Sequence, residues 1–239
     1  KYFLQMDGDT DSRHVVAILD GWFAWHFSDL LEVQFGKRKV PGTRNWMLGA
    51  FDTRLADRPF SNEFFRPSRT TGVWFVGDPT DATHYEFMVG QGYNTEGLTP
   101  SETGDDFAVA GTSWWDVVGS YGPARPCDFE MHDKLAVRIG SSWVNSNEGT
   151  PGRQLEEADF LRLTDGTRLT ETGALAPGAT VESFHVSLFA VDAAFKYRGW
   201  SANAEYFWRS VTDLSSNLPV PSVGLQYGFY VEGGFFVLP

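Results

Sequence analysis

The chain has 239 residues, 42% of them apolar, and its 31 Asp and Glu against 19 Lys and Arg give a formal net charge of −12. This acidic balance argues against a nucleic-acid partner, because neutralising phosphates requires a basic surface. The apolar content excludes an intrinsically disordered chain, and the single cysteine, Cys127, excludes an intrachain disulfide.

Apolar and polar residues alternate with a period of two along much of the chain, without any sustained helical spacing. This alternation predicts ten strands, over residues 1–7, 14–28, 30–39, 70–78, 83–91, 105–118, 134–145, 182–198, 199–212 and 222–238. Many of them exceed the about 5–6 residues usual for a strand. A strand that crosses a membrane needs about 9–11 residues and is bordered by aromatic side chains, as at Trp25, Trp200 and Trp208.

The connections between these strands alternate in length. The turns at Ser28-Asp29 and Gly199 are tight, whereas segments 40–69 and 146–181 are long. Outer-membrane barrels have long loops on one side and short turns on the other. The sequence therefore predicts an all-β fold, an antiparallel transmembrane β-barrel, as one domain over residues 1–239. In this barrel, 40–69 folds inward as a constriction loop and 146–181 is a long surface loop.

Positive charge gathers between residues 37 and 69, where eight basic residues face three acidic ones. The basic residues are Lys37, Arg38, Lys39, Arg44, Arg54, Arg58, Arg66 and Arg69. Folded into a barrel lumen, this segment would narrow the pore and favour anions. The alternative is that these cations pair with nearby carboxylates and only hold the loop in place, since arginine suits both roles.

The alternation also predicts charged residues on the inward face of the wall. They include Glu32, Arg138, Lys196, Arg198, Glu205 and Arg209. Acidic and basic residues are nearly balanced on this face, so we expect them to pair across neighbouring strands. Selectivity would then come from the loop.

Several short motifs resemble those of one porin family. They are Phe35-Gly-Lys-Arg-Lys-Val-Pro41, Asp57-Arg-Pro-Phe60, Arg69-Thr-Thr-Gly-Val73, Val89-Gly-Gln-Gly-Tyr-Asn94, Val137-Arg-Ile-Gly-Ser-Ser142, Val191-Asp-Ala-Ala-Phe-Lys-Tyr-Arg-Gly-Trp-Ser201, Ala204-Glu-Tyr-Phe-Trp-Arg209 and Gly228-Phe-Tyr-Val-Glu-Gly-Gly-Phe-Phe-Val-Leu-Pro239. In order and spacing they resemble the phosphate-selective porin O/P family.

The resemblance implies an outer-membrane barrel of sixteen strands, often a homotrimer, with an inward loop that forms a basic constriction. It places Lys37–Lys39, Arg44, Arg58 and Arg69 in that constriction. Ten strands are fewer than sixteen, so we expect strands to be missing at both ends. The expected partners are outer-membrane lipid and small solutes or anions, in a Gram-negative-type bacterium.

Other functions find less support in the sequence. Asp7, Asp9 and Asp11 resemble the start of a calcium loop, but the glycine and the final glutamate of such a loop are lacking. No catalytic motif or cofactor loop is present, so the chain is not expected to be an enzyme or to carry a cofactor. The alternatives left open are a soluble carbohydrate-binding β-sandwich and an outer-membrane barrel with a structural role.

Overall fold

The computed structural model describes residues 1–7, 17–95, 107–149 and 161–236, and in these ranges it contains the ten strands that the sequence predicts. The strands are β1 (Tyr2–Asp7), β2 (Ala17–Ser28), β3 (Leu31–Lys39), β4 (Arg69–Thr80), β5 (Thr83–Gly90), β6 (Phe107–Val118), β7 (Ala136–Glu148), β8 (Val181–Tyr197), β9 (Trp200–Ser216) and β10 (Gln226–Phe235).

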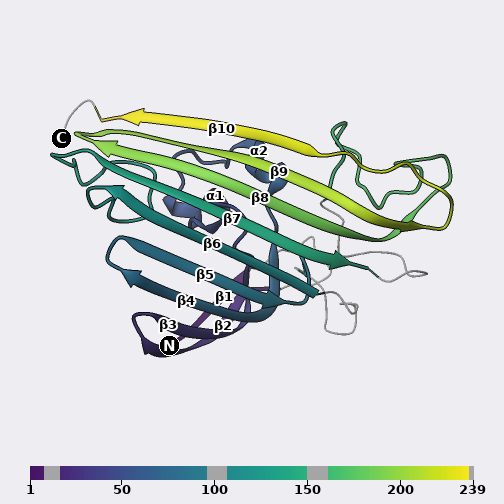
Figure 1. Cartoon of the computed structure of the whole chain (residues 1–239), viewed down its shortest axis with the longest axis horizontal. Coiled ribbons are helices and arrows are strands. Elements are labelled where there is room, and N and C mark those ends of the chain that lie inside the picture. Colours follow the sequence, from purple (N-terminus) through teal and green to yellow (C-terminus); the bar gives the residue numbers. More distant parts are fainter. Residues whose placement is uncertain (8–16, 96–106, 150–160, 237–239) are drawn as a thin grey trace.

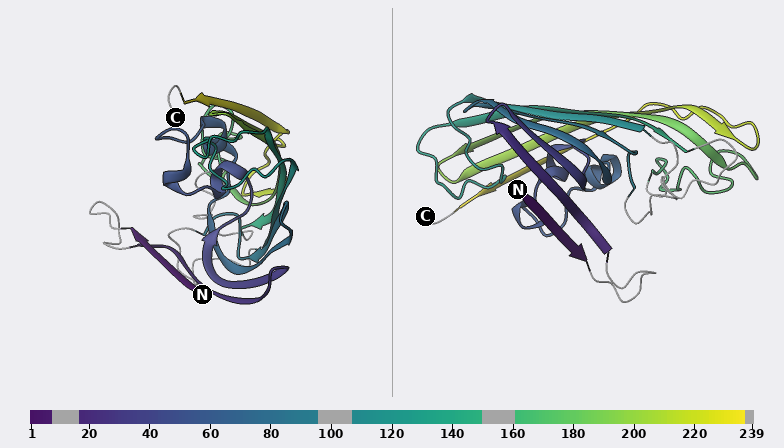
Figure 2. Two further views of the ribbon diagram at one scale, coloured as in Figure 1. Left: turned by 90° about the vertical axis from the view of Figure 1, so that its left-hand side faces the viewer. Right: turned by 90° about the horizontal axis from the view of Figure 1, so that it is seen from below.

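All ten strands lie in one antiparallel sheet, each paired with its neighbours in the sequence from β1 to β10 (Figure 1). The sheet is strongly curved, with a convex and a concave face (Figure 2). It is open rather than closed, because β1 and β10 lie at opposite edges. The antiparallel all-β prediction is thus confirmed, whereas closure into a barrel is not observed in this chain.

Two-residue connections join the strands at 29–30, 81–82 and 198–199, but the long connection 119–135 between β6 and β7 breaks the predicted alternation of short and long connections. The turn between β8 and β9 holds Arg198 and Gly199 at φ values of 48° and 81°. Left-handed backbone of this kind lets two long strands reverse within two residues. Strands β8 and β9, 17 residues each, pair from Val181 and Ser216 to Tyr197 and Trp200.

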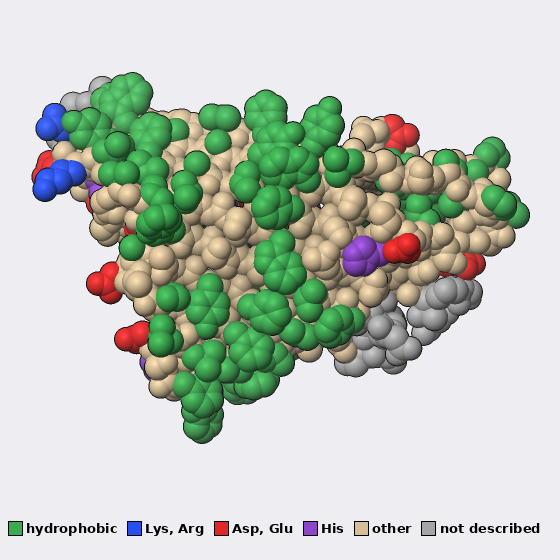
Figure 3. Space-filling view, viewed as in Figure 1, with side chains coloured by type: hydrophobic (Ala, Val, Ile, Leu, Met, Phe, Trp, Pro, Cys, Tyr) green, Lys and Arg blue, Asp and Glu red, His purple; other side chains and the backbone are tan. Residues whose placement is uncertain are grey.

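The convex face is apolar and aromatic. On β8 the exposed positions run Phe189, Val191, Ala193, Phe195 and Tyr197, and each alternates with a buried one. On β9 the same face carries Trp200, Ala202, Ala204, Tyr206 and Trp208. Figure 3 shows hydrophobic side chains spread over this face, with charged groups mostly at its edges.

These apolar runs end at a sharp boundary. Beyond Phe189 and Trp208, which pair in register, the convex positions become polar at Ser187 and Ser210. The hydroxyl of Ser187 donates to Asn145 Oδ1 at 2.7 Å, which continues the polar row onto β7. The uncharged apolar band is therefore about nine residues long on β8 and on β9, the length needed for one membrane crossing.

The concave face combines a hydrophobic core with buried charge. Trp74, Met88 and Phe207 are fully buried there. So are Lys196 and Arg209, although lysine and arginine are almost never fully buried unless they are paired. In this sheet the buried charged side chains lie on the concave side beside this core, whereas the convex side carries exposed apolar side chains.

The segment between β3 and β4, residues 40–68, lies on the concave face and is called the inner segment below (Figure 2). It contains three short helices that the sequence analysis does not predict: α1 (Arg44–Met47), η1 (Ala50–Asp52) and α2 (Phe60–Phe65). Helices of three to six residues are too short to produce a periodic pattern. The hydroxyl of Thr43 caps α1 by accepting from Trp46 N at 3.3 Å.

The predicted surface loop 146–181 differs in the structure. Strand β7 extends to Glu148, and β8 begins at Val181. In the described part of the loop, Leu161 and Leu169 are fully buried and belong to the hydrophobic core. The two leucines complete the core at the end of the sheet, which the sequence analysis does not predict, while many of the residues around them are exposed. Among the described residues, no helix has the length and apolarity needed to span a membrane.

Candidate functional site

The inner segment is fixed to the wall through one buried carboxylate. Glu205 on β9 is 2% exposed and accepts hydrogen bonds from the backbone N–H groups of Arg44 (2.7 Å) and Asn45 (3.4 Å) at the start of α1. The hydroxyl of Tyr230 donates to the same carboxylate at 3.2 Å. These bonds satisfy N–H groups that a helix start leaves without partners. Glu205 thereby sets the position of α1 over β9 and β10.

Four cations surround one indole ring of the inner segment. The side-chain nitrogen of Lys39 and the guanidinium carbons of Arg58, Arg66 and Arg69 lie 4.7, 5.5, 3.9 and 5.3 Å from the centre of Trp46. Cations within about 6 Å of an aromatic face are attracted by its quadrupole. The ring is buried, so a large share of the positive charge of residues 37–69 converges on one point.

Two of these cations bind backbone oxygens at the end of α1. Lys39 Nζ donates to the carbonyls of Trp46 and Leu48 at 2.9 and 2.8 Å. Arg58 donates to the carbonyl of Asn45 and, at 2.9 Å, to that of Leu48. Carbonyls at a helix end carry partial negative charge and favour cations. Burial lowers the pKa of Arg58, and nearby Arg66 and Arg69 lower it further.

The remaining arginines of the segment bind the wall. Arg44 Nη1 lies 2.5 Å from Asp192 Oδ1 on β8, and Arg38 Nη2 lies 3.1 Å from Glu86 Oε1 on β5. Arg54 Nη2 donates to the carbonyl of Pro126 at 2.7 Å.

Arg54 Nη1 donates to the hydroxyl of Ser201 at 3.1 Å, and its Nη2 reaches Asn203 Oδ1 at 3.3 Å. Arg44 and Arg54 of the inner segment therefore contact β8, β9 and the connection between β6 and β7, whereas Arg38, on β3, binds β5 within the wall.

A second aromatic ring is surrounded by cations from both the wall and the inner segment. Arg44, Arg138 and Lys196 lie 5.3, 4.6 and 4.3 Å from the centre of Tyr121, in the connection between β6 and β7. Arg138 also binds both carboxylate oxygens of Asp116, at 2.5 and 3.2 Å. Burial raises the pKa of the Tyr121 phenol, and the neighbouring guanidinium groups oppose that rise.

The basic residues of the predicted constriction fall into two groups. Arg38, Arg44, Arg66 and Arg69 each contact a carboxylate, those of Glu86, Asp192, Glu63 and Asp20. Lys39, Arg54 and Arg58 form no salt bridge within the described part of the chain and hydrogen-bond to carbonyl, amide or hydroxyl oxygens instead. These three carry the least compensated positive charge of the site.

Lys37 lies apart from this arrangement. It pairs in register with Thr71, whose side chain is exposed, and it follows Gly36 at a φ of 137°. Successive residues of a strand point to opposite faces. Lys37 is therefore on the face of β3 opposite to Arg38.

Five of the six predicted wall residues occupy the concave side. Glu32 is hydrogen-bonded by Gln34, and Glu205, Arg138 and Lys196 make the contacts given above. Arg209 donates to Gln226 Oε1 at 2.8 Å and to the carbonyl of Phe64 on α2. The prediction for Arg198 is wrong: it lies exposed in the turn between β8 and β9 and stacks on Tyr197. The predicted strand 182–198 ends one residue beyond β8, which stops at Tyr197.

The residues of the predicted calcium loop fall at the end of β1 and beyond it. Asp7 is the last residue of β1, and Asp9 and Asp11 lie outside the described residues. A different set of possible metal ligands is Asp128, Glu130 and His132, whose donor atoms lie within 4.8 Å of one another. Asp128 already accepts hydrogen bonds from Gly199 N and from His132, so this set fastens the turn between β8 and β9.

Sequence reasoning missed three residues at the centre of the site: Trp46, Asp116 and Tyr121. Asp116 could have been found, because it occupies an inward position of a predicted strand and pairs in register with Arg138. Trp46 and Tyr121 lie in connections between strands, where no periodicity indicates the direction of a side chain.

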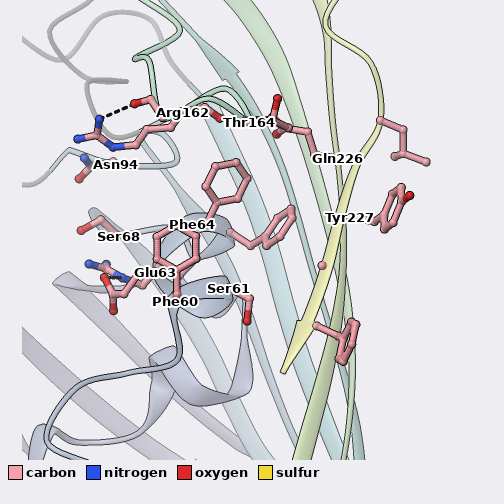
Figure 4. Close-up of a pocket in the computed structure, with 16 residues that line it drawn as sticks. Phe60, Ser61, Glu63, Phe64, Ser68, Asn94, Arg162, Thr164, Gln226 and Tyr227 are labelled. Carbon is pink, nitrogen blue, oxygen red and sulfur yellow. Dashed lines mark hydrogen bonds and ion pairs between the residues drawn. The ribbon is translucent and has the colours of Figure 1, made fainter. Parts of the chain in front are cut away.

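Two cavities adjoin the inner segment. A groove of about 1200 Å³ lies beside α2 and the edge strand β10, and its lining includes Phe60 and Phe64 of α2 (Figure 4). Gly228 is required at this edge, because a Cβ atom there would lie 2.6 Å from Phe65. A smaller cavity of about 210 Å³ lies between the inner segment and the wall, and its lining includes Arg38, Arg44, Glu86, Arg138 and Asp192.

Comparisons with known proteins add no family to this description. No protein-family model matches the chain. No curated protein matches it with significant similarity either. The resemblance to the phosphate-selective porin O/P family therefore rests on the motifs quoted above and stays a prediction.

Proposed function

We propose that this chain forms part of the wall of a porin in the outer membrane of a Gram-negative-type bacterium, and that small solutes diffuse through it passively. The observation that carries the proposal is the reversed patterning of the sheet. An uncharged aromatic band covers the convex face, while Glu205, Lys196 and Arg209 are buried on the concave side. A sheet in water favours the opposite arrangement, whereas a membrane barrel has a lipid-facing apolar band and a polar interior.

Membrane insertion requires that the open edges be paired. Backbone N–H and C=O groups facing lipid must have partners, and only a closed sheet provides them. An eight-stranded barrel is filled by its own side chains, whereas sixteen to eighteen strands leave a channel. The concavity here holds α1 and α2 as well, which favours a large barrel such as the sixteen strands of the porin O/P family. The groove beside β10 is where a further strand would pack.

The proposed selectivity is for anions, through the inner segment. Lys39, Arg54 and Arg58 form no salt bridge among the described residues, so they are the part of the basic cluster whose charge is least compensated. Charges of one sign in a narrow lumen attract ions of the opposite sign. A homotrimer remains an expectation from the family resemblance.

The test is ion conductance in planar bilayers under a salt gradient. The full chain should conduct with a reversal potential that favours anions, and the double variant Arg54→Gln with Arg58→Gln should move that potential toward cations. The control is Asp20→Asn with Arg69→Gln, which removes a salt bridge without changing the net charge. An unchanged reversal potential in the first variant would contradict the role of the inner segment.

A barrel with a structural role is the second candidate. It is favoured by the number of segments on the concave side, since residues 161–180 and the connection between β6 and β7 join the inner segment there. Protein that inserts into bilayers but does not conduct would favour this function. The carbohydrate-binding sandwich has less support, because a sandwich needs two sheets and the described strands form one.

A further inference from the structure

The smaller cavity is built from opposite charges. It has a volume of about 210 Å³ and lies between the inner segment, the wall and Ala124 of the connection between β6 and β7. At about 30 Å³ per water molecule, it has room for roughly seven waters or for one small solute. Most drug-sized ligands need larger pockets, of about 300–1,000 Å³.

Two charged groups in the lining have unfulfilled hydrogen-bonding capacity. Arg44 uses Nη1 to bind Asp192, but its buried Nη2 has no hydrogen-bond partner among the described residues. Glu86 Oε1 is also buried and accepts no hydrogen bond, although Arg38 Nη2 lies 3.1 Å away. Leaving a buried polar atom unsatisfied costs about 1–3 kcal/mol, and more for a charged group. The cavity therefore offers one donor and one acceptor to a ligand.

The charges that line the cavity are balanced, which disfavours ligands that carry a single charge. Arg38, Arg44 and Arg138 are balanced by Glu86 and Asp192 in the lining, and by Asp116 behind Arg138. A lone anion would meet two carboxylates, and a lone cation would meet three guanidinium groups. A molecule with both charges can place each one beside its opposite.

We propose that this cavity binds a small zwitterionic amino acid, with its carboxylate at Arg44 Nη2 and its ammonium at Glu86 Oε1. Met47, Leu48 and Trp114 supply an apolar part of the lining that suits a short side chain. Glycine, alanine and serine, with about five to seven non-hydrogen atoms, match the size of the cavity. The inference rests on the proposed function, since it names a class of solute that would pause on its way through the pore.

The experiment is saturation-transfer-difference NMR on the full chain in detergent micelles. Glycine and serine should give saturable signals with a Kd of about 1 mM, whereas acetate and methylammonium at the same concentrations should give none. Binding of acetate as strong as that of glycine, or no binding of the amino acids, would overturn the proposal.

Variants locate the binding in this cavity. Arg44→Gln and Glu86→Gln should each weaken serine binding at least tenfold, and the control Arg198→Gln, which removes an exposed guanidinium from a turn, should leave it unchanged. If Arg44→Gln does not fold, Glu86→Gln and the ligand series on the unmodified chain remain decisive. Unchanged binding in Glu86→Gln would overturn the proposal.

Conductance, measured separately, distinguishes this proposal from the porin itself. Protein that conducts but does not bind amino acids would contradict only the amino-acid site. Protein that binds amino acids but does not conduct would support that site and contradict the porin function.

Discussion

The two faces of the same strands have opposite chemistry. Along β9, the convex side carries Trp200, Ala204 and Trp208, whereas the concave side carries Glu205, which is 2% exposed, and Arg209, which is fully buried. Both sets come from one alternating stretch of sequence. The alternation predicts a strand with two unlike faces, but it does not say which face is covered by protein.

What distinguishes the faces is what covers them. The concave charges are covered by the inner segment and are matched by specific partners, such as Glu205 with the N–H groups of Arg44 and Asn45. The convex side chains have no protein cover, and Phe229 and Tyr227 are 66% and 70% exposed. An exposed apolar patch of this kind indicates a contact with protein or lipid. The difference between the two faces is explained if the convex side chains contact lipid rather than water.

A charge placed on the convex face should have the largest effect. Ala204→Arg lies midway between Trp200 and Trp208, and in a bilayer it should cost about 2–4 kcal/mol of folding free energy. Thr212→Arg, on the same face of β9 but beyond the polar boundary, should cost about 0–1 kcal/mol. The measurement is reversible urea unfolding from lipid bilayers. Equal small costs for both variants would mean that the convex face is in water.

The fold is more predictable than the packing that fills it. The long strands such as β8 and β9 follow from period-two alternation, because their two faces are unlike. The short helices α1 and α2 and the buried Leu161 and Leu169 were not predicted. Their positions depend on contacts between segments far apart in the sequence, such as Arg209 with the carbonyl of Phe64. No local pattern records such contacts.

Removing the buried anchor on the concave face should have the next largest effect. Glu205→Ala leaves the N–H groups of Arg44 and Asn45 buried without an acceptor, which should cost about 1.5–3 kcal/mol. Amide hydrogen exchange at residues 44 and 45 should accelerate accordingly. The control is Glu232→Gln on β10, whose carboxylate is contacted by Asn203 at 3.3 Å, and we expect it to cost less than about 0.5 kcal/mol. Unchanged exchange in Glu205→Ala would show that α1 is held by other contacts.

A smaller effect concerns acid stability at the turn end of the sheet. Although burial opposes it, hydrogen bonds from His132 and Gly199 hold the pKa of Asp128 below its ordinary value. A carboxyl whose pKa is lowered by folding stabilises the fold above its unfolded pKa of about 3.9, and this stabilisation is lost as the pH falls.

Asp128→Asn should therefore cost about 1 kcal/mol near neutral pH and progressively less below pH of about 4. Urea unfolding between acid and neutral pH measures both values. Asp29→Asn, with a side chain 96% exposed, is the control and should show no such pH-dependent difference. A cost for Asp128→Asn that stays constant with pH would contradict the assignment.

The candidate site was predictable in composition but only partly in arrangement. The excess of positive charge in residues 37–69 is visible in the sequence, and so is the inward position of Arg138, Lys196 and Glu205. The convergence of Lys39, Arg58, Arg66 and Arg69 on Trp46 is not, because it depends on how the inner segment folds back on itself. Which of these cations form a salt bridge with a carboxylate also depends on how the inner segment folds.

The most direct test of the central claim is the environment of the convex face in a reconstituted membrane. Nitroxide labels would be placed at Ala193→Cys and Val231→Cys within the apolar band and at Thr212→Cys beyond it, in a Cys127→Ser background. Labels at 193 and 231 should be accessible to oxygen and shielded from a water-soluble nickel complex, whereas the label at 212 should be accessible to nickel. Equal nickel accessibility at all three positions would contradict a lipid-facing wall.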